Sequence, residues 1–328
     1  MGTTLQLGHE EQTDQVRVRT ELEQVSTKRN STLTIGVFDG VHLGHQHLVS
    51  VLRNEAAKSG LSAGVLTFRN HPASVLNPNF EPKYLTTLRA RVEHLESTNV
   101  DYIIPITFDV ELSRISATQF VAMLLQYLKM EMLVVGPDFA MGHNREGTTT
   151  TLMRLATEAD FKVKTVKPLL DSSGGAVRSS SVRKALASGD IHRVSSLLGR
   201  RFVLEGKVVT GCGRGTSLGY PTANLDVPRE LAFPGDGIYT TWAHINNHQY
   251  MATTSVGAKP TFGNGQRAIE AFVLDFNGDL YGQDMELEFV DRLRDQVRFD
   301  SVKTLQEQMH KDVEQTRRVL GDAKMQPV

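Results

Sequence analysis

Residues 34–46 read T-I-G-V-F-D-G-V-H-L-G-H-Q, and this stretch decides the fold of the first half of the chain. It opens with uncharged, β-forming residues, which are typical of a strand buried on both faces. These residues are Thr34, Ile35, Val37 and Phe38. Asp39 and Gly40 then indicate a turn. From about Leu43 the apolar residues recur four apart, as in a helix that Gly60 can end. The stretch therefore predicts a buried strand, a tight turn and a helix.

Two histidines stand at the start of this predicted helix. His42 and His45 are three residues apart, so their side chains are expected on one side of the first turn. Unpaired backbone N–H groups and the positive end of the helix dipole favour an anion there. Such a site could hold nucleotide phosphates and stabilise charge on an α-phosphorus under attack. A histidine pair on a surface helix often has no function, but the glycines at 36, 40 and 44 and the abrupt change from strand to helix favour a functional site.

The composition of the chain excludes several classes of protein. Its 328 residues favour two domains. A net charge of −1 with 22% charged residues gives no basic excess for nucleic acid. No apolar run approaches the roughly 20 residues that span a bilayer, and residues 1–15 lack the hydrophobic segment of a signal peptide. The single cysteine, Cys212, excludes internal disulfides and suits a reducing compartment. We expect a cytoplasmic protein without nucleic-acid or membrane partners.

Strands and helices alternate through the first half. Besides the strand at Thr34, strands are expected at residues 62–68, 101–106, 132–136 and 163–169. Val16 and Val18 alternate with arginines, which predicts a short edge strand, and Ser116 with Gln119 forms a capping-box pattern that opens a helix. This alternation predicts a parallel, doubly wound sheet whose ligands lie at the carboxyl ends of the strands.

Two later segments of the first half carry polar groups that could bind a ligand. Residues 136–147 read G-P-D-F-A-M-G-H-N-R-E-G, whose glycines and proline predict an irregular loop. Asp138 near the strand's tip is either a site residue or a turn-forming residue. Residues 179–183 read S-S-S-V-R and open a helix. The serines either cap that helix or, with Arg183 behind them, bind phosphates.

The pattern changes after Gly199 to strands without intervening helices. The strand-like runs cover residues 202–210, 237–245, 249–256, 268–276 and 285–290. Short strands with Gly, Asn and Pro turns predict an antiparallel barrel. Asn277-Gly278 predicts a type I′ hairpin between two of these runs, and residues 304–320 predict a closing helix. The apolar stripe of that helix consists of Leu305, Met309, Val313 and Val319.

Residues 211–225 read G-C-G-R-G-T-S-L-G-Y-P-T-A-N-L and form the densest motif of the second half. Its first three glycines, which let the backbone N–H groups surround a phosphate, are Gly211, Gly213 and Gly215. Thr222 and Asn224 are two apart, so on an extended segment both side-chain oxygens project to one side. Together with phosphate oxygens and waters, these oxygens suit Mg²⁺. The alternative is a glycine-rich hairpin loop without a ligand.

Glu270 is the candidate catalytic base. In its predicted strand it shares one face with Phe272, Leu274 and Phe276, so the carboxylate is expected to face the interior or a cavity. A buried carboxylate is costly unless it is paired or useful. Loss of hydration would make it a stronger base, able to take the proton of a substrate hydroxyl. The alternative is a strand-end carboxylate that points to solvent.

Together these motifs resemble one family. G-x-F-D-G-V-H-x-G-H at residues 36–45 resembles the phosphate-binding signature of the HxGH nucleotidyltransferase superfamily. L-G-Y-P-T-A-N-L at residues 218–225 is typical of riboflavin kinases, and the chain is similar to prokaryotic bifunctional riboflavin kinase/FAD synthetases over most of its length. It departs from the usual family residues at five positions. The family residues Phe, Ser, Thr, Arg and His are replaced by Met141, Arg178, Ser180, Thr216 and Phe272, respectively.

The resemblance implies two activities on one chain. The barrel would transfer the γ-phosphoryl group of ATP·Mg²⁺ to riboflavin, giving FMN and ADP, and the α/β domain would adenylylate FMN to FAD with release of pyrophosphate. The implied domains are an adenylyltransferase at 14–187, a linker helix at 188–199 and a kinase barrel at 200–322. The oligomeric state is left between a monomer and a weak homo-oligomer.

The resemblance also implies a role for each candidate residue. Glu270, His42 and His45 would be catalytic, and Thr222 and Asn224 would hold Mg²⁺. The residues implied to bind nucleotide or phosphate are Gly36, Phe38, Asp39, Gly40, Gly44, Asp138, Ser179, Ser180, Arg183, Gly211, Gly213, Gly215 and Gly219.

Three alternatives stay open. Arg178 in the serine motif motivates a riboflavin kinase whose adenylyltransferase domain is impaired and only binds nucleotide. A flavin-binding regulatory protein would bind riboflavin without consuming ATP. A nucleotidyltransferase could use another acceptor, which an assay with flavin would distinguish.

Overall fold

The computed structural model describes residues 16–25, 27–211, 215, 219–258 and 267–323. The chain divides into two compact units. Unit 1 consists of Met1–Pro82 and Thr87–Val177, and unit 2 consists of Lys83–Thr86 and Arg178–Val328. Each unit is described by itself below.

Unit 1 is built on a five-stranded parallel sheet in the order β3-β2-β1-β4-β7. The strands are β1 Ser31–Gly36, β2 Ser62–Phe68, β3 Tyr102–Ile106, β4 Met130–Val135 and β7 Lys162–Thr165. The chain adds β2 and β3 on one side of β1, and β4 and β7 on the other. The loops that follow β1 and β4 therefore leave the sheet at its switch point, where open α/β sheets bind ligands. This confirms the predicted doubly wound parallel sheet.

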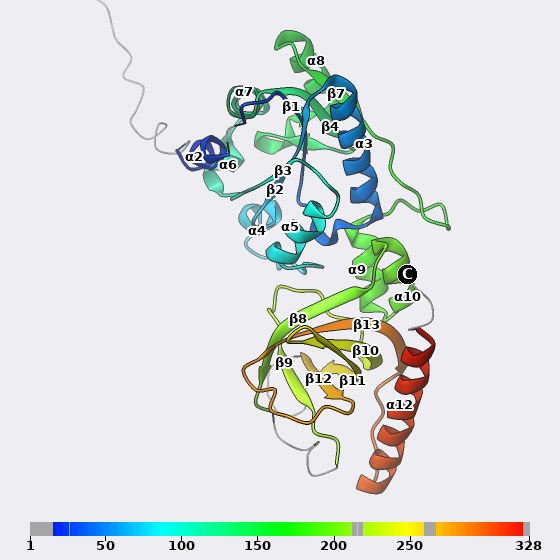
Figure 1. Ribbon diagram of the computed structural model, residues 1–328. Coiled ribbons are helices and arrows are strands. Elements are labelled where there is room, and N and C mark those ends of the chain that lie inside the picture. The colour runs from blue at the N-terminus through cyan, green and yellow to red at the C-terminus, as the bar shows by residue number, and fades with distance from the viewer. Residues whose placement is uncertain (1–15, 26, 212–214, 216–218, 259–266, 324–328) are drawn as a thin grey trace, which may run out of the picture. The chain divides into compact units, whose positions relative to one another are not determined.

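Helices cover both faces of this sheet (Figure 1). The helices of unit 1 are α2 Val16–Gln24, α3 Leu43–Ser59, α4 Pro72–Leu76, α5 Leu88–Glu96, α6 Val110–Arg114, α7 Ala117–Leu128 and α8 Thr149–Glu158, with the 3-10 turns η1 Asp39–Val41 and η2 His143–Arg145. The short strands β5 Ala140–Met141 and β6 Gly147–Thr148 pair with each other beside the main sheet. The predicted capping box at the start of α7 is present, because Ser116 and Gln119 exchange side-chain hydrogen bonds with each other's backbone N–H.

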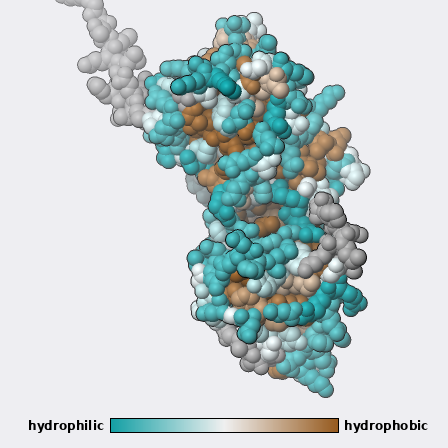
Figure 2. Space-filling model, viewed as in Figure 1, coloured by the Kyte–Doolittle hydropathy of each residue, from teal (hydrophilic) through white to brown (hydrophobic). Residues whose placement is uncertain are grey.

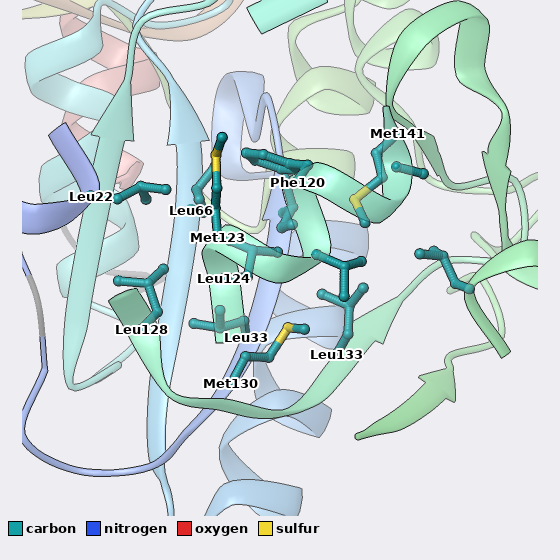
Figure 3. Packing of buried hydrophobic residues seen from close by; sticks show 14 of the residues in the cluster. Leu22, Leu33, Leu66, Phe120, Met123, Leu124, Leu128, Met130, Leu133 and Met141 are labelled. Carbon is teal, nitrogen blue, oxygen red and sulfur yellow. The ribbon is translucent and has the colours of Figure 1, made fainter. Parts of the chain in front are cut away.

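Two hydrophobic layers hold the helices against the sheet. On one face Leu33 and Leu133 of the strands pack with Phe120 and Leu124 of α7, and Leu22 of α2 joins the same cluster (Figure 3). On the other face the buried residues of α3 and α5 pack against β2 and β4; among them are Val49, Leu52, Leu95, Val65 and Val134. Each such side chain contributes about 1.5–3 kcal/mol when it leaves water, so burial on both faces explains why β1 has no charged residue.

Residues 16–24 form a helix, so the predicted edge strand at Val16 and Val18 is wrong. Val18 is 4% exposed and Leu22 is fully buried. These two residues are four apart and join the core cluster that contains α7. The alternation of valine and arginine covers only four residues. It is outweighed by the helical spacing of Val18 and Leu22, which lets the core bury both side chains.

Unit 2 contains a closed six-stranded antiparallel barrel in the order β10-β11-β12-β9-β8-β13. The strands are β8 Phe202–Val209, β9 Ala223–Asp226, β10 Gly237–Ile245, β11 His248–Ala258, β12 Arg267–Val273 and β13 Asp284–Arg294. The helices are α9 Ser179–Ala187, α10 Ile191–Leu198 and α12 Val302–Ala323. This confirms the predicted antiparallel barrel with a closing helix.

The hairpin predicted at Asn277-Gly278 is wrong. β12 pairs with β11 and β9, whereas β13 pairs with β10 and β8, so the two strands on either side of this dipeptide are not neighbours. A type I′ turn needs positive φ at both central residues, but positive φ occurs at Asp275 and Gly282 and not at Asn277 or Gly278. The segment is a connection across the barrel end.

The closing helix α12 packs on the barrel through a stripe that is partly polar. Its buried residues Asp312, Thr316 and Leu320 are four apart. Thr316 Oγ1 lies 2.9 Å from Thr253 Oγ1, and Asp312 pairs with Arg294 at 2.6 Å. The apolar stripe predicted for this helix is only half-buried, because its residues lie beside the row formed by Asp312, Thr316 and Leu320.

The surface of the described residues is mainly hydrophilic in the view of Figure 2, with hydrophobic residues in a few groups. Exposed large apolar side chains are spread over several elements, for example Leu76 in α4, Met153 in α8 and Val203 in β8. None of the helices within the described residues is long and apolar enough to cross a membrane.

Candidate active sites

The turn that follows β1 has a strained backbone. β1 ends at Gly36, so Phe38, which the sequence placed within the strand, lies beyond it. Phe38, Gly40 and Val41 have φ of 51°, 78° and 39°. Positive φ is unfavourable for a β-branched residue, and strain of this kind persists only where the surroundings enforce it. The side chains of Phe38 and Val41 are 2% and 1% exposed, so the core holds the turn in this conformation.

The structure brings His42 and His45 together. His42 is the N-cap of α3, not a residue of its first turn, and its Nδ1 accepts a hydrogen bond from the His45 N–H at 3.3 Å. The two rings stack with centroids 3.7 Å apart and planes at 18°. Since Nδ1 accepts, a neutral His42 carries its proton on Nε2, where it can be donated to an anion.

His45 is held in its neutral form. Burial lowers its pKa well below 6.5, and the neighbouring His42 and Arg91 lower this pKa further. The residue as a whole is half-buried, but its Nδ1 is fully buried and has no hydrogen-bond partner among the described residues. A buried polar atom without a protein partner is a natural place for a ligand's hydrogen bond.

Arg91 is a functional candidate that the sequence reasoning missed. Its side chain is 1% exposed, and its Nη1 donates to the Phe68 carbonyl oxygen at 2.7 Å. Phe68 is the last residue of β2, so Arg91 brings a buried positive charge to the carboxyl edge of the sheet. The available signal was its spacing, because Arg91 and Leu95 are four apart and are the buried residues of α5.

The glycines of this turn are required by close packing. A β-carbon on Gly44 would lie 2.5 Å from the Val177 carbonyl oxygen and 3.1 Å from the His42 ring. At Gly36 it would lie 3.1 Å from the Phe38 ring. Asp39 is 2% exposed within η1. The His45 and Gln46 N–H groups donate to the His42 carbonyl oxygen at 2.8 and 3.0 Å. The donors that α3 can offer beside the two imidazoles are therefore the N–H groups at its very start, which have no acceptor within the helix.

The loop after β4 is fastened to the start of α7. Glu146 Oε1 accepts a hydrogen bond from Ala117 N at 2.8 Å, and the His143 ring lies 3.0 Å from the Ser113 carbonyl oxygen. Asp138 is exposed in this loop. Its binding of a nucleotide stays a prediction.

The serine motif lies in unit 2, in the first turn of α9. The N-cap is Arg178, which makes no side-chain cap hydrogen bond. Of the two alternatives for the serines, the one in which a serine is the N-cap is therefore wrong, and phosphate binding stays a prediction. Ser180 is exposed, and its hydroxyl has no partner among the described residues. Arg183 Nε donates to the Lys83 carbonyl oxygen at 2.8 Å.

In the barrel, Glu270 and Asn224 are directly paired across strands β12 and β9. Their side chains consequently share a face, with β-carbons about 5 Å apart. Thr222 is two residues before Asn224, at the entry to β9, and falls on the same face if the chain stays extended. The side chains of Glu270 and Asn224 make no hydrogen bond to another described residue, so their oxygens are available to a ligand.

Of the two places predicted for the Glu270 carboxylate, the barrel interior is wrong, whereas a cavity stays a prediction. The buried face of β12 is formed by Ile269, Ala271 and Val273, whereas Glu270 and Phe272 lie on the opposite, half-buried face. The reason is that β12 carries apolar residues on both faces, since the Phe272 ring packs edge-on against Tyr220 at 5.2 Å. Alternation therefore could not decide which face is inside.

The glycine-rich loop packs directly on the proposed metal ligands. A β-carbon on Gly211 would overlap the Asn224 amide, and one on Gly215 would lie 3.2 Å from Thr222 Oγ1. Gly219 has φ of 85°, which favours glycine. Gly213, Cys212 and Thr216 lie outside the described residues.

The donor set suits a hard cation that is also bound by phosphate. Thr222, Asn224 and Glu270 offer only oxygen ligands of the kind Mg²⁺ prefers. Within the described part of the chain, no three His, Cys, Asp or Glu residues come together as a metal site. Mg²⁺ here would accordingly depend on nucleotide oxygens and water for most of its coordination.

Comparison with known proteins places both units in one family. The FAD synthetase family model matches residues 24–181, and the riboflavin kinase model matches residues 198–320. A bifunctional riboflavin kinase/FMN adenylyltransferase of Listeria monocytogenes is 33% identical over 89% of this chain and 93% of its own length. The protein of the same name from Escherichia coli is 31% identical over 88% of this chain and 92% of its own length.

A solved structure from Streptococcus pneumoniae, described as a macrolide-efflux protein, has a TM-score of 0.82 and 32% identity over 89% of this chain and 95% of that one. The fold of most of this chain thus has a counterpart among solved structures. Both family matches and both curated relatives point to the same pair of activities. The chain therefore belongs to the family of bifunctional riboflavin kinase/FMN adenylyltransferases.

Proposed function

We propose that the barrel of unit 2 phosphorylates riboflavin, with Glu270 as the general base. The carboxylate takes the proton from the terminal ribityl hydroxyl as that oxygen attacks the γ-phosphorus of ATP, giving FMN and ADP. Thr222 and Asn224 hold the metal and the phosphates, and the backbone at Gly211, Gly215 and Gly219 approaches the phosphates closely. Bound Mg²⁺ would neutralise charge on the phosphate oxygens. The single observation that carries this proposal is the direct pairing of Glu270 with Asn224.

We propose that the strained turn and α3 of unit 1 catalyse adenylylation of FMN. The phosphate of FMN attacks the α-phosphorus of ATP, and pyrophosphate leaves. His42 Nε2–H and the neutral imidazole of His45 donate hydrogen bonds to the oxygens that gain charge. Ser179, Ser180 and Arg183 bind nucleotide phosphates, as does the Asp138 loop. The stacking of buried His42 on half-buried His45 at a helix N-terminus supports this assignment.

Further features of the enzyme belong to the same proposal. The working domains are 14–187 for adenylylation and 200–322 for phosphorylation, with 188–199 as the linker. Mg²⁺ is the metal for both reactions, and the ligands are riboflavin, FMN, FAD and ATP/ADP. We also propose a cytoplasmic enzyme that does not bind nucleic acid and is a monomer or weak homo-oligomer.

Reciprocal variants test the division of labour. Glu270→Gln keeps the size of the side chain but removes the base, so FMN formation should fall at least 100-fold while adenylylation of supplied FMN stays within twofold. His45→Ala should lower adenylylation by roughly 10²–10³, as expected for loss of an oxyanion donor, and leave FMN formation unchanged. Both half-reactions are measured by chromatography of the flavin products. An equal loss of both activities in a folded variant would contradict the assignment.

The remaining alternatives give different results in the same assays. An impaired adenylyltransferase would yield FMN without FAD. A regulatory flavin-binding protein would bind riboflavin but leave ATP unconsumed. A transferase for another acceptor would fail to convert FMN to FAD.

A further inference from the structure

The strand on the other side of Glu270 carries a serine that the proposed mechanism does not use. In the barrel, Glu270 of β12 pairs with Asn224 of β9 on one side and with Ser255 of β11 on the other. Residues directly opposite each other across antiparallel strands share a face, with β-carbons about 5 Å apart. The candidate base is thus flanked by a phosphate- or metal-binding amide and by a half-buried hydroxyl.

The Ser255 hydroxyl is oriented by a residue that follows β13. Gln296 Nε2 donates a hydrogen bond to Ser255 Oγ at 3.1 Å. The glutamine amide rests on Gly257, two residues farther along the same face of β11, where an added β-carbon would overlap all three atoms of the amide group. Gly257 therefore makes room for the Gln296 amide, and Gln296 occupies a lone pair of the Ser255 oxygen.

A hydroxyl whose oxygen already accepts a hydrogen bond has its own proton left to donate. The acceptor offered on the same face by the paired residue is the Glu270 carboxylate, which has no hydrogen-bond partner among the described residues. We propose that Ser255 is a positioning residue for riboflavin phosphorylation: when substrate is bound, its hydroxyl donates to one oxygen of Glu270. The other carboxylate oxygen is then turned toward the substrate hydroxyl. This inference rests on the proposed role of Glu270 as the base.

If Ser255 positions the base, its removal should lower the rate of the chemical step more than it weakens substrate binding. The free energy of a hydrogen bond to a charged group corresponds to about a ten- to hundredfold change in a rate constant. Ser255→Ala should therefore lower kcat for riboflavin phosphorylation roughly ten- to hundredfold and change the riboflavin KM less than threefold. Ser255→Thr keeps the hydroxyl and should retain kcat within threefold. Gln296→Met keeps the chain length but loses the donor, and should lower kcat in the same direction by a smaller factor.

Thr253→Ala is the matched control. Thr253 lies two residues away on the same face of β11, and its hydroxyl is bonded to Thr316 of α12. Removing it should lower the unfolding temperature of the barrel without changing kcat. Adenylylation of supplied FMN serves as an internal reference for the amount of active protein in every preparation.

A double-mutant cycle makes the test specific. In a Glu270→Gln background, Ser255→Ala should have no further effect, because the group that it positions is gone. A full kcat in both Ser255→Ala and Gln296→Met would overturn the proposal, as would an equal loss in Thr253→Ala. Should Ser255→Ala not fold, the exposed Gln296→Met carries the test. Kinase activity that survives Glu270→Gln would instead refute Glu270 as the base. A failure of the Ser255 proposal can therefore be distinguished from a failure of the proposed role of Glu270.

Discussion

At the scale of single residues, the chemistry depends on side chains whose state is set by their surroundings. His45 is kept neutral by burial first, and then by the neighbouring His42 and Arg91, which lower its pKa. Arg91 is itself 1% exposed, so its charge is poorly screened by water. The result is a positively charged site in which the His45 imidazole itself is uncharged.

The charge state of His45 can be measured directly. In an NMR titration of the full-length protein, we expect its ring resonances to show no protonation until the pH is well below 6.5, because the pKa is lowered. In Arg91→Met one cause of the shift is removed, so the pKa should move up toward 6.5 while remaining below it. A wild-type His45 that titrates at or above 6.5 would contradict this account.

The same shift sets the sign of a pH effect on stability. The unfolded chain takes up a proton at His45 near pH 6.5, whereas the folded chain does so only at lower pH. The contribution of His45 to stability is therefore complete above about pH 6.5 and decreases as the pH falls toward the folded pKa. Hydrogen exchange can measure the free energy of unfolding of unit 1. This free energy should decrease between neutral and mildly acidic pH, and it should decrease less in His45→Phe. An equal loss in both proteins would show that other groups are responsible.

The sequence predicted which residues to suspect but not how each is placed. The spacing of His42 and His45 predicted that they lie together, because residues three apart at a helix start are neighbours. The resemblance implied a role for both Glu270 and Asn224 in the kinase reaction. The face of β12 on which Glu270 lies could not be predicted, because both faces of this strand carry apolar residues. Arg91 and Ser255 were missed because their environments are created by other elements, Phe68 in one case and Gln296 in the other.

At the scale of elements, α12 shows how a helix can be attached by polar contacts. Arg294 at the end of β13 makes two hydrogen bonds to the Asp312 carboxylate, at 2.9 and 2.6 Å. A second arginine–aspartate pair joins Arg317 of α12 to Asp275 at 2.7 Å, but both of its side chains are exposed. The two pairs have similar geometry and differ mainly in burial.

This difference predicts unequal effects of two matched substitutions. Asp312→Asn leaves the Arg294 charge in a largely buried place, and should cost about 3 kcal/mol, or roughly 10 °C in the Tm of the barrel. Asp275→Asn should have a much smaller effect, because water screens an exposed pair. The fluorescence of Trp242, the single tryptophan and 3% exposed in β10, reports the transition. Equal effects of the two substitutions would refute the role of burial.

Sequence patterns predicted most elements correctly where the pattern was long. The strands of the main sheet and five of the six barrel strands were expected close to their observed ranges, since several residues in each share one period. The barrel strand β9 was not predicted as a strand, because its four residues are too few to define a period. The pattern failed at Val16–Val18, where four residues cannot define a period, and at Asn277-Gly278, where a turn dipeptide cannot reveal which strands are neighbours. Barrel closure brings β13 to β10 and β8, which is a property of the whole sheet.

At the scale of the molecule, the two units have separate cores, and one short segment leaves unit 1 to join unit 2. Lys83–Thr86 belongs to unit 2, where Tyr84 N donates to the Glu230 carbonyl oxygen and Ala232 N donates to the Tyr84 carbonyl oxygen, both at 2.7 Å. Every strand of the barrel nevertheless comes from residues after 178.

The barrel should consequently work alone. We expect residues 178–323 to fold and to phosphorylate riboflavin, because the closed barrel and both flanks of Glu270 are retained. Its Tm should be lower than that of the barrel in the whole chain, since Tyr84, which hydrogen-bonds to Glu230 and Ala232, is lost. Adenylylation should be absent, as His42 and His45 are missing. A folded barrel segment without kinase activity would contradict the assignment of Glu270.

The most direct test of two activities on one chain is a time course of the products formed from riboflavin and ATP·Mg²⁺ by the full-length enzyme, separated by chromatography. The account predicts that FMN appears first, with ADP, and that FAD and pyrophosphate follow as FMN is consumed. FMN that accumulates without any FAD, or riboflavin that stays unchanged while ATP is intact, would contradict it.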